Sequence, residues 1–297
     1  MPAQGPYCCC ERYRARDFNH VRLLYYIRSV FALVCHMCEL FGLSASQPLT
    51  VRQELEQFRL RGGFAADNPD GWGLAWRENE AFHLAKEPQA AHCSAGFKIL
   101  CETTRSSLVI AHVRKARFPP INTLNNTHPF QHLCCGKAWV FAHNGLVPDV
   151  VEMAQENDGS ICRPAGETDS EHAFCHLLGH LSRIFHHSGL ADIVTSFQAL
   201  AQALAGMSEI IASRGKFNFL MSDGEHLMAY GHDRLHYLEL SDASAESAMI
   251  ATEPLAGVNG WIPFEPGELR IYCSGRKVGR ILTRPSDRML DPQSTPA

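Results

Sequence analysis

The chain has 297 residues, 45% of them hydrophobic and 20% charged, a composition typical of a globular protein with one large or two small domains. Its formal net charge is -4 at pH 7, so no basic excess offers a surface to nucleic acid or to an anionic membrane. No window holds about eighteen consecutive apolar residues, and a membrane span is therefore not expected.

The first 36 residues differ from the rest of the chain. They contain three adjacent cysteines, Cys8 to Cys10, a stretch of mixed charge, and then the aromatic and aliphatic segment 21–35. Arg28 interrupts that segment and no small-x-small cleavage site follows it, so the sequence does not support a secretory signal. The twelve cysteines fall at irregular spacings, which favours free thiols in a reducing cytoplasm. We therefore expect a cytoplasmic protein.

From Met37 onward, short apolar runs predict strands, each bounded by glycine, proline, asparagine or charged residues. The first four cover 39–43, 72–76, 108–113 and 138–142. Two helices follow. The first has an apolar face between Ala173 and Phe185 and begins at a capping-box pattern formed by Thr168 and Glu171. The second covers 191–212, with a weak point at Gly206.

The last third of the chain again predicts strands. Those at 218–221 and 227–230 are joined by Asp223-Gly224, a good hairpin turn. Further strands are expected at 235–240, 249–252 and 269–273. Strands, then two helices, then antiparallel strands favour an α+β fold in which sheets are stacked between helical layers.

The pair Met37-Cys38 opens the first predicted strand and has a specific chemical use. If Met37 is the initiator and is removed, Cys38 carries both a thiol and a free α-amine. An α-amine titrates near pH 8, so its neutral form can accept the thiol proton and later deliver it to a leaving group. Taken alone, the pair would more simply be explained by a buried structural cysteine. Other segments are needed to decide.

Three such segments supply groups that could hold an α-amino acid beside a nucleophile. Asn144-Gly145 follows a predicted strand and offers an amide and a backbone N–H for an oxyanion hole, or forms an ordinary turn. Arg114 ends another strand and could bind a carboxylate or lie on the surface. Asp169 stands at a helix start, where it could bind an ammonium group or cap the helix. The combination is more specific than any single member.

The order of these motifs resembles that of the class-II glutamine amidotransferases, which use an N-terminal cysteine, and in particular their stand-alone members. The resemblance spans nearly all of residues 38–280. It is carried by MCELFGLS, GGFAADNPDGWGLAW, AHVRKA, NTHPF, FAHNGLV, GETDSEHAF and FNFLMSDG. It implies an N-terminal nucleophile hydrolase fold, with two antiparallel sheets between helices in a four-layer αββα arrangement.

The resemblance also implies a role for each matching residue. These are the nucleophile Cys38, the oxyanion-hole residues Asn144 and Gly145, the α-carboxylate ligand Arg114, the α-ammonium ligand Asp169, and the pocket residues Thr127 and His128. The implied reaction cleaves the γ-amide of glutamine or of another γ-glutamyl compound through a thioester on Cys38. Neither a metal nor an organic cofactor is needed.

Two departures from the family pattern concern the substrate and the acceptor. Larger synthase members continue after the arginine with Trp-Ala-Thr-His, whereas Arg114 is followed here by Lys115, Ala116, Arg117 and Phe118, so the pocket is expected to differ. The C-terminal part is also too short for an ammonia-consuming synthase domain. An ammonia-accepting partner would be another protein, and free hydrolysis is equally compatible with the sequence.

The extension makes the proposed chemistry conditional, because with residues 1–37 attached Cys38 has a peptide nitrogen in place of its amine. Three interpretations are open: Met37 is the true initiator, 1–37 is a propeptide that is removed, or the chain stays intact and inactive. We expect residues 38–284 to form the amidotransferase domain and 285–297 a flexible tail. The alternative to an enzyme is a catalytically silent regulatory or binding subunit with the same fold.

A group of histidines and one cysteine in the first predicted helix requires a separate interpretation. It comprises Cys175, His176, His180, His186 and His187. Cys175 and His176 face different directions from much of this group on a helix, and no paired C-x-x-C spacing accompanies them. We expect surface or interface histidines and no metal.

Overall fold

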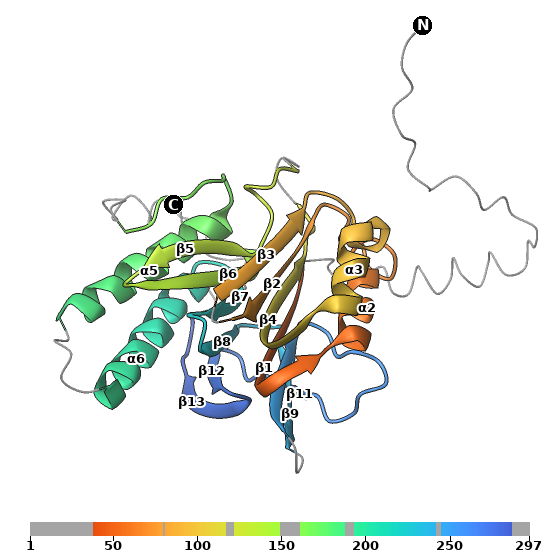
Figure 1. The fold of residues 1–297 in the computed structure, drawn as a ribbon. Helices are drawn as coiled ribbons and strands as arrows, with labels where there is room; N and C mark the ends of the chain where they lie inside the picture. The colour runs from red at the N-terminus through yellow and green to blue at the C-terminus, as the bar shows by residue number, and fades with distance from the viewer. Residues whose placement is uncertain are drawn as a thin grey trace, which may run out of the picture. The chain divides into compact units, whose positions relative to one another are not determined.

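The computed structural model describes residues 38–79, 81–116, 122–148, 161–187, 193–241 and 245–286 (Figure 1). Residues 1–37, which hold the predicted extension, and most of the predicted tail lie outside these ranges. The strands within them form two antiparallel sheets, one of seven strands and one of six. None of the helices in these ranges is both long and apolar enough to cross a bilayer.

The first sheet has the strand order β11-β9-β10-β1-β4-β2-β3. Its strands are β1 (Glu39–Thr50), β2 (Trp72–Glu78), β3 (Ala81–Glu87), β4 (Arg105–Val113), β9 (His236–Ser241), β10 (Glu246–Ala251) and β11 (Ile262–Pro263). The strand β1 is central, since Leu40 pairs with His112 on β4 and Gly42 pairs with Ile250 on β10. Cys38 therefore lies at the start of a strand with neighbours on both sides.

The second sheet has the order β13-β12-β8-β7-β6-β5. Its strands are β5 (Phe130–Cys134), β6 (Lys137–Leu146), β7 (Lys216–Ser222), β8 (His226–Gly231), β12 (Glu268–Cys273) and β13 (Arg276–Leu282). The predicted hairpin at Asp223-Gly224 is confirmed, because it joins the paired strands β7 and β8. The Asp223 carboxylate accepts the backbone N–H groups of Glu225 and His226, and Gly224 adopts a φ of 92°, which favours glycine.

The helices cover the outer faces of the two sheets (Figure 1). The helices α2 (Arg52–Arg61) and α3 (Ala95–Thr103), with the short 3-10 helix η1 (Ala91–Cys93), pack on the first sheet. The helices α5 (Asp169–His187) and α6 (Ile193–Ala212) pack on the second. These are the two outer layers of a four-layer arrangement.

Three buried apolar clusters correspond to the three spaces between four layers. One joins Leu55 and Phe58 of α2 to the first sheet, and another joins Phe174 of α5 and Leu204 of α6 to the second. The third, which includes Leu40, Ile110, Val140, Leu220 and Ala248, lies between the sheets. Burial of apolar side chains is the main term that holds such layers together. The predicted α+β fold with an αββα arrangement is confirmed.

Several boundaries differ from those predicted. The strand β6 continues through Asn144 and Gly145, so the prediction that this pair follows the strand is wrong. Backbone pairing with β7 carries the strand past the end of its apolar run. The helix α6 also runs through Gly206 without interruption, and a Cβ added there would meet no other atom. An exposed helical glycine costs only about 1 kcal/mol, which the surrounding packing offsets.

The expectation of free thiols is confirmed for six described cysteines and wrong for two. The six are Cys38, Cys93, Cys101, Cys134, Cys135 and Cys273. Cys162, in the segment before α5, and Cys175, within that helix, are joined in a disulfide. The expectation of surface or interface histidines in this helix is wrong for His176, which is buried with 4% of the residue exposed. The side chains of His186 and His187 lie outside the described residues.

Candidate active site

The thiol of Cys38 is held by the backbone that follows β4. Its Sγ accepts the Lys115 N–H at 3.2 Å and lies 3.4 Å from the Lys115 carbonyl oxygen, to which it can donate. The segment that provides these groups begins with Arg114, directly after β4 as the sequence predicts. The AHVRKA motif therefore lies against the start of MCELFGLS.

A second segment supports the first through backbone bonds. The Arg114 N–H donates to the Gly71 carbonyl at 2.8 Å, and the Asp70 N–H donates to the Arg114 carbonyl at 3.0 Å. The Asp70 carboxylate also accepts the Ala116 N–H at 2.7 Å. The Asp70-Gly71 part of the DGWG motif thus positions the loop that contacts Cys38.

Charges around Cys38 act on its thiol in opposite directions. Burial has the largest effect and raises the pKa of the Cys38 thiol. The hydrogen bond from the Lys115 backbone and the positive charge of Arg114 lower this pKa, whereas the negative charge of Asp169 raises it. The net effect is a raised pKa, so the thiol remains protonated at neutral pH. A reaction that needs the thiolate must therefore supply a base.

The guanidinium of Arg114 is buried, with 7% of the residue exposed. Its Nη1 donates to the Asn122 side-chain oxygen at 3.3 Å. The prediction left open whether this arginine lies on the surface or in a site. Its burial, and its effect on the Cys38 thiol, exclude the surface interpretation.

Asp169 is the first residue of α5, where the sequence allowed either a capping role or a binding role. The cap is Thr168, whose Oγ1 accepts the Glu171 N–H at 3.2 Å. The Glu171 carboxylate reaches past the capping-box position to accept the Gly166 N–H at 2.7 Å. Asp169 is instead fixed by the Val147 N–H, which donates to its Oδ2 at 2.8 Å.

The side chain of Asn144 is fully buried between the two sheets. Its Nδ2 donates to the Thr252 hydroxyl oxygen at 3.3 Å, and the same oxygen accepts the Leu40 N–H at 2.9 Å. Thr252 therefore links Asn144 on β6 to the strand that begins after Cys38. Within the described residues, Asn144 Oδ1 has no hydrogen-bond partner, which is unusual for a buried amide.

Gly145 is required by the close approach of the neighbouring strand. A Cβ at this position would lie 1.8 Å from the Lys216 carbonyl oxygen. No other residue fits here without movement of β7. The glycine that follows Asn144 is therefore explained by packing as well as by any role in binding.

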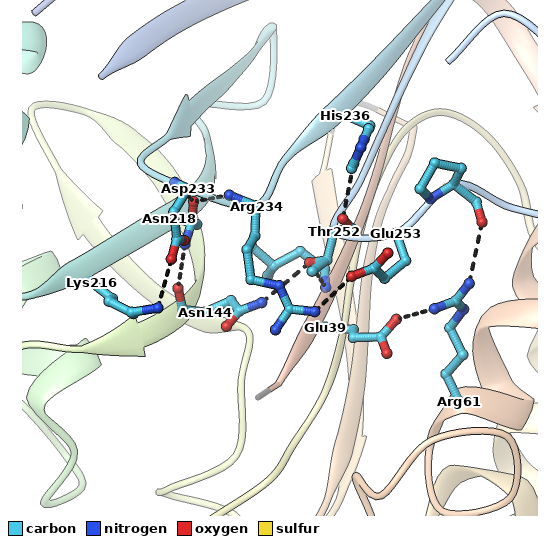
Figure 2. Close-up of polar contacts among 12 residues, drawn as sticks. Glu39, Arg61, Asn144, Lys216, Asn218, Asp233, Arg234, His236, Thr252 and Glu253 are labelled. Atoms are coloured by element: carbon cyan, nitrogen blue, oxygen red, sulfur yellow. Dashed lines mark hydrogen bonds and ion pairs between the residues drawn. The ribbon is translucent and has the colours of Figure 1, made fainter. Parts of the chain in front are cut away.

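The backbone of Asn144 is held by Asn218 on β7, a residue that the sequence analysis did not single out. Asn218 Nδ2 donates to the Asn144 carbonyl at 3.1 Å and to Asp233 Oδ1 at 2.8 Å (Figure 2). Its Oδ1 accepts three backbone N–H groups at 2.8 to 3.2 Å, from residues 232–234. The sequence does contain a pattern that indicates this role: an asparagine inside the apolar strand of FNFLMSDG is expected to be buried, and a buried amide needs hydrogen-bond partners.

Thr127 and His128 are buried next to the glycines of the DGWG motif. A Cβ on Gly71 would lie 3.3 Å from the Thr127 side chain, and one on Gly73 would lie 2.1 Å from the His128 carbonyl. The His128 ring stacks on His112 at 4.2 Å. Burial lowers the pKa of His128 well below its usual range, so its ring is neutral. Their part in lining the substrate pocket stays a prediction.

Among the described residues, two groups of side chains have a geometry that could hold a metal ion. They are His132 with Cys162 and Cys175, and Glu225 with His226 and Cys273. Neither includes Cys38, Arg114 or Asp169.

The family model and the related sequences that match this chain agree on one family. Residues 37–242 match the family model described as glutamine amidotransferases class-II. The chain is 32% identical over 264 residues to the Escherichia coli K12 protein named "Putative glutamine amidotransferase YafJ", covering 82% of this chain and 100% of that protein. It is 29% identical over 297 residues to a Haemophilus influenzae protein named "Putative glutamine amidotransferase", covering 93% and 95%.

Comparison with known structures gives the same fold. The crystal structure of a "predicted glutamine amidotransferase" from Pseudomonas aeruginosa PA01 has a TM-score of 0.59 at 28% identity, covering 82% of this chain and all of that one. Glutamine phosphoribosylpyrophosphate amidotransferase from B. subtilis has a TM-score of 0.58 at 17% identity, covering 82% of this chain and 49% of that one. The latter similarity shows the N-terminal nucleophile hydrolase fold alone.

Proposed function

The chain belongs to the class-II glutamine amidotransferases, and from that premise we propose that it hydrolyses the γ-amide of glutamine or of another γ-glutamyl compound, with Cys38 as nucleophile. One observation carries the proposal: the Cys38 thiol lies against the backbone of Lys115, next to the buried Arg114, and the Asp169 carboxylate is near enough to raise the pKa of the thiol. Two opposite charges beside a nucleophile suit a zwitterionic amino acid, whose α-carboxylate pairs with arginine and whose α-ammonium pairs with aspartate.

The proposed reaction proceeds through a thioester. The free α-amine of Cys38 accepts the thiol proton, and the thiolate attacks the γ-carbonyl carbon, whose oxygen becomes negative and accepts hydrogen bonds from Asn144 and Gly145. The carbon–nitrogen bond breaks, and the α-amine delivers the proton to the departing ammonia or amine. Water then attacks the thioester, its proton passes through the α-amine to sulfur, and glutamate is released.

The contacts of Asn144 support its place in the oxyanion hole. A half-turn of its amide would exchange Nδ2 and Oδ1, which are of nearly equal size. The Thr252 hydroxyl, which already accepts the Leu40 N–H, would then donate to Oδ1. The Nδ2 group would occupy the position that has no partner among the described residues and could donate to the substrate oxygen. We propose this orientation for the substrate complex.

The experiment that tests the function uses a chain that begins at Cys38. Glutamate release is measured with L-glutamine, glutathione and a γ-glutamyl amine, with D-glutamine as a control for the Arg114 and Asp169 contacts. Release from at least one L-substrate, with little from D-glutamine, is expected. If no γ-glutamyl compound yields glutamate, a silent subunit is the better description.

Two finer points belong to the same proposal. We place the reaction in the cytoplasm, because six described cysteines are free thiols. The ammonia either dissolves or passes to an acceptor protein. Adding a candidate acceptor would distinguish these cases, since only a true partner would divert nitrogen from free ammonia to a product.

Replacing Arg114 with alanine is expected to raise KM for substrates that carry a free α-carboxylate. Removing one partner of a buried charge pair costs roughly 2 to 5 kcal/mol, which corresponds to about 30- to 4,000-fold in KM. The matched control is Arg105→Ala at the exposed start of β4, which should leave KM unchanged. Steady-state glutamate release measures both. Equal KM values for Arg114→Ala and the parent would remove Arg114 from the site.

Replacing Asn218 with alanine is expected to lower kcat by about 10- to 100-fold with a smaller effect on KM, because a small displacement of a catalytic group is costly. The variant loses the bond that holds the Asn144 carbonyl. The control Asp233→Ala removes contacts with Asn218 and Lys216 and retains the bond to Asn144. A kcat that falls equally in both variants, in step with their melting temperatures, would indicate a purely structural role.

A further inference from the structure

Side chains from three separate segments converge at a place that the proposed reaction does not use. They are His132 on β5, Cys162 in the segment before α5, and Cys175 within α5. One ligand atom from each lies within 4.8 Å of the others. The cysteines are buried, with 7% and 4% exposed, and the His132 side chain is 18% exposed. Solvent therefore reaches this group from one side.

The two thiols are joined in the structure, but a reducing compartment would separate them. Reduction breaks the sulfur–sulfur bond, adds two electrons and two protons, and leaves two thiols beside one imidazole. Two sulfurs and one nitrogen form a donor set that suits Zn²⁺. We propose that the reduced protein binds one Zn²⁺ ion through Cys162, Cys175 and His132, with the fourth position open to water.

The charges of this set suit a buried position. Two cysteine thiolates offset the charge of Zn²⁺, and their two protons are released to solvent on binding. Because the two thiolates cancel the charge of Zn²⁺, these three groups can lie in the apolar cluster that includes Phe174 and Leu178, where an unpaired ion could not.

A carboxylate beside the histidine completes the arrangement. The Nε2 atom of His132 lies 3.0 Å from Glu171 Oε1, and the other Glu171 oxygen accepts the Gly166 N–H. Metal-binding histidines usually have such a carboxylate partner, which orients the ring and makes it a better ligand. Glu171 is two residues from Asp169, so the metal would also brace the start of α5.

The second group with suitable geometry gives a matched control. Glu225, His226 and Cys273 offer one sulfur, and His226 already contacts the Asp223 carboxylate. Glu225 is also exposed. This set has fewer soft ligands and less burial, and we expect it to hold zinc weakly or not at all.

The test uses the full chain. A phosphine reductant opens the disulfide, taking an oxygen atom from water to become a phosphine oxide. Zn²⁺ is then added, the excess is removed by gel filtration, and bound metal is counted by mass spectrometry. The parent should retain about one zinc more per chain than His132→Ala, which leaves both cysteines in place, and than Cys162→Ser. His226→Ala and Cys38→Ser should match the parent, so the failure of the proposed reaction would not affect this result.

A spectroscopic measurement identifies the ligands. Co²⁺ added to the reduced parent should give the near-ultraviolet charge-transfer band of thiolate ligands, and this band should be lost in Cys175→Ser. Zn²⁺ should also raise the melting temperature of the parent and not that of His132→Ala. Equal zinc content in the parent and His132→Ala, or a disulfide that persists under reductant, would overturn the proposal.

Discussion

Replacing Cys38 with alanine is expected to abolish glutamate release, lowering kcat by roughly four orders of magnitude or more, as removal of a catalytic nucleophile does in other enzymes. No neighbouring group can replace the nucleophile, because the proposed thioester forms on the Cys38 sulfur. The variant should fold normally, since the hydrogen bonds of the Cys38 thiol within the described part of the chain go to the backbone of one residue, Lys115. Release of glutamate by a chain that begins at this position is the measurement.

A matched control separates loss of the nucleophile from loss of a thiol. Cys273 is a free cysteine of intermediate exposure at the end of β12, and Cys273→Ala should retain parental activity. Melting temperatures of both variants should lie near that of the parent. If Cys38→Ala still hydrolyses glutamine and every γ-glutamyl dipeptide at the parental rate, Cys38 is not the nucleophile.

Activity should also depend on the presence of residues 1–37. A chain that begins at Cys38 has a free α-amine, whereas the longer chain has a peptide nitrogen that cannot accept a proton. Losing a general base lowers the rate by about 10²- to 10⁴-fold. Because burial raises the pKa of the Cys38 thiol, few thiolates would form without that base. We expect the longer chain to be nearly inactive.

The pH dependence provides a second measure of the same group. The amine acts as a base only when neutral, so kcat/KM for the chain beginning at Cys38 should rise as pH increases through the amine pKa, near 8 when unperturbed. Acetylating the N-terminus should abolish this rise together with the activity. A longer chain of equal activity would show that the amine is not required. Intact-mass measurement of protein from cells would show which form exists.

The sequence predicted those features of the site that depend on neighbouring residues in the chain, and it did not predict those that depend on contacts between distant residues. Arg114 was placed at the end of a strand because the apolar run of β4 ends one residue earlier, a local pattern. The role of Asp169 stayed open, because capping and binding both favour a carboxylate at a helix start. The Thr168 hydroxyl caps the helix in the structure, and substrate binding by Asp169 stays a prediction.

Features that depend on contacts distant in sequence were not predicted. The bond from Asn218 to Asn144 joins residues 74 positions apart, and no spacing rule brings them together.

The strands β3, β5, β11 and β13 were missed because most of their side chains are partly or fully exposed, which weakens the apolar alternation that reveals a strand. The helix α2 was missed because most of its residues are charged or polar, and Leu55 and Phe58 are its only buried apolar residues.

The position of Cys38 at the start of a central strand has a practical consequence for anyone who produces this protein. A purification tag or reporter fused ahead of this residue would convert its nitrogen into an amide, as residues 1–37 do. Under the proposed mechanism, such a preparation would lack the α-amine base and would be nearly inactive in an assay. A tag placed after β13, or one removed by a protease that leaves cysteine first, would avoid the loss.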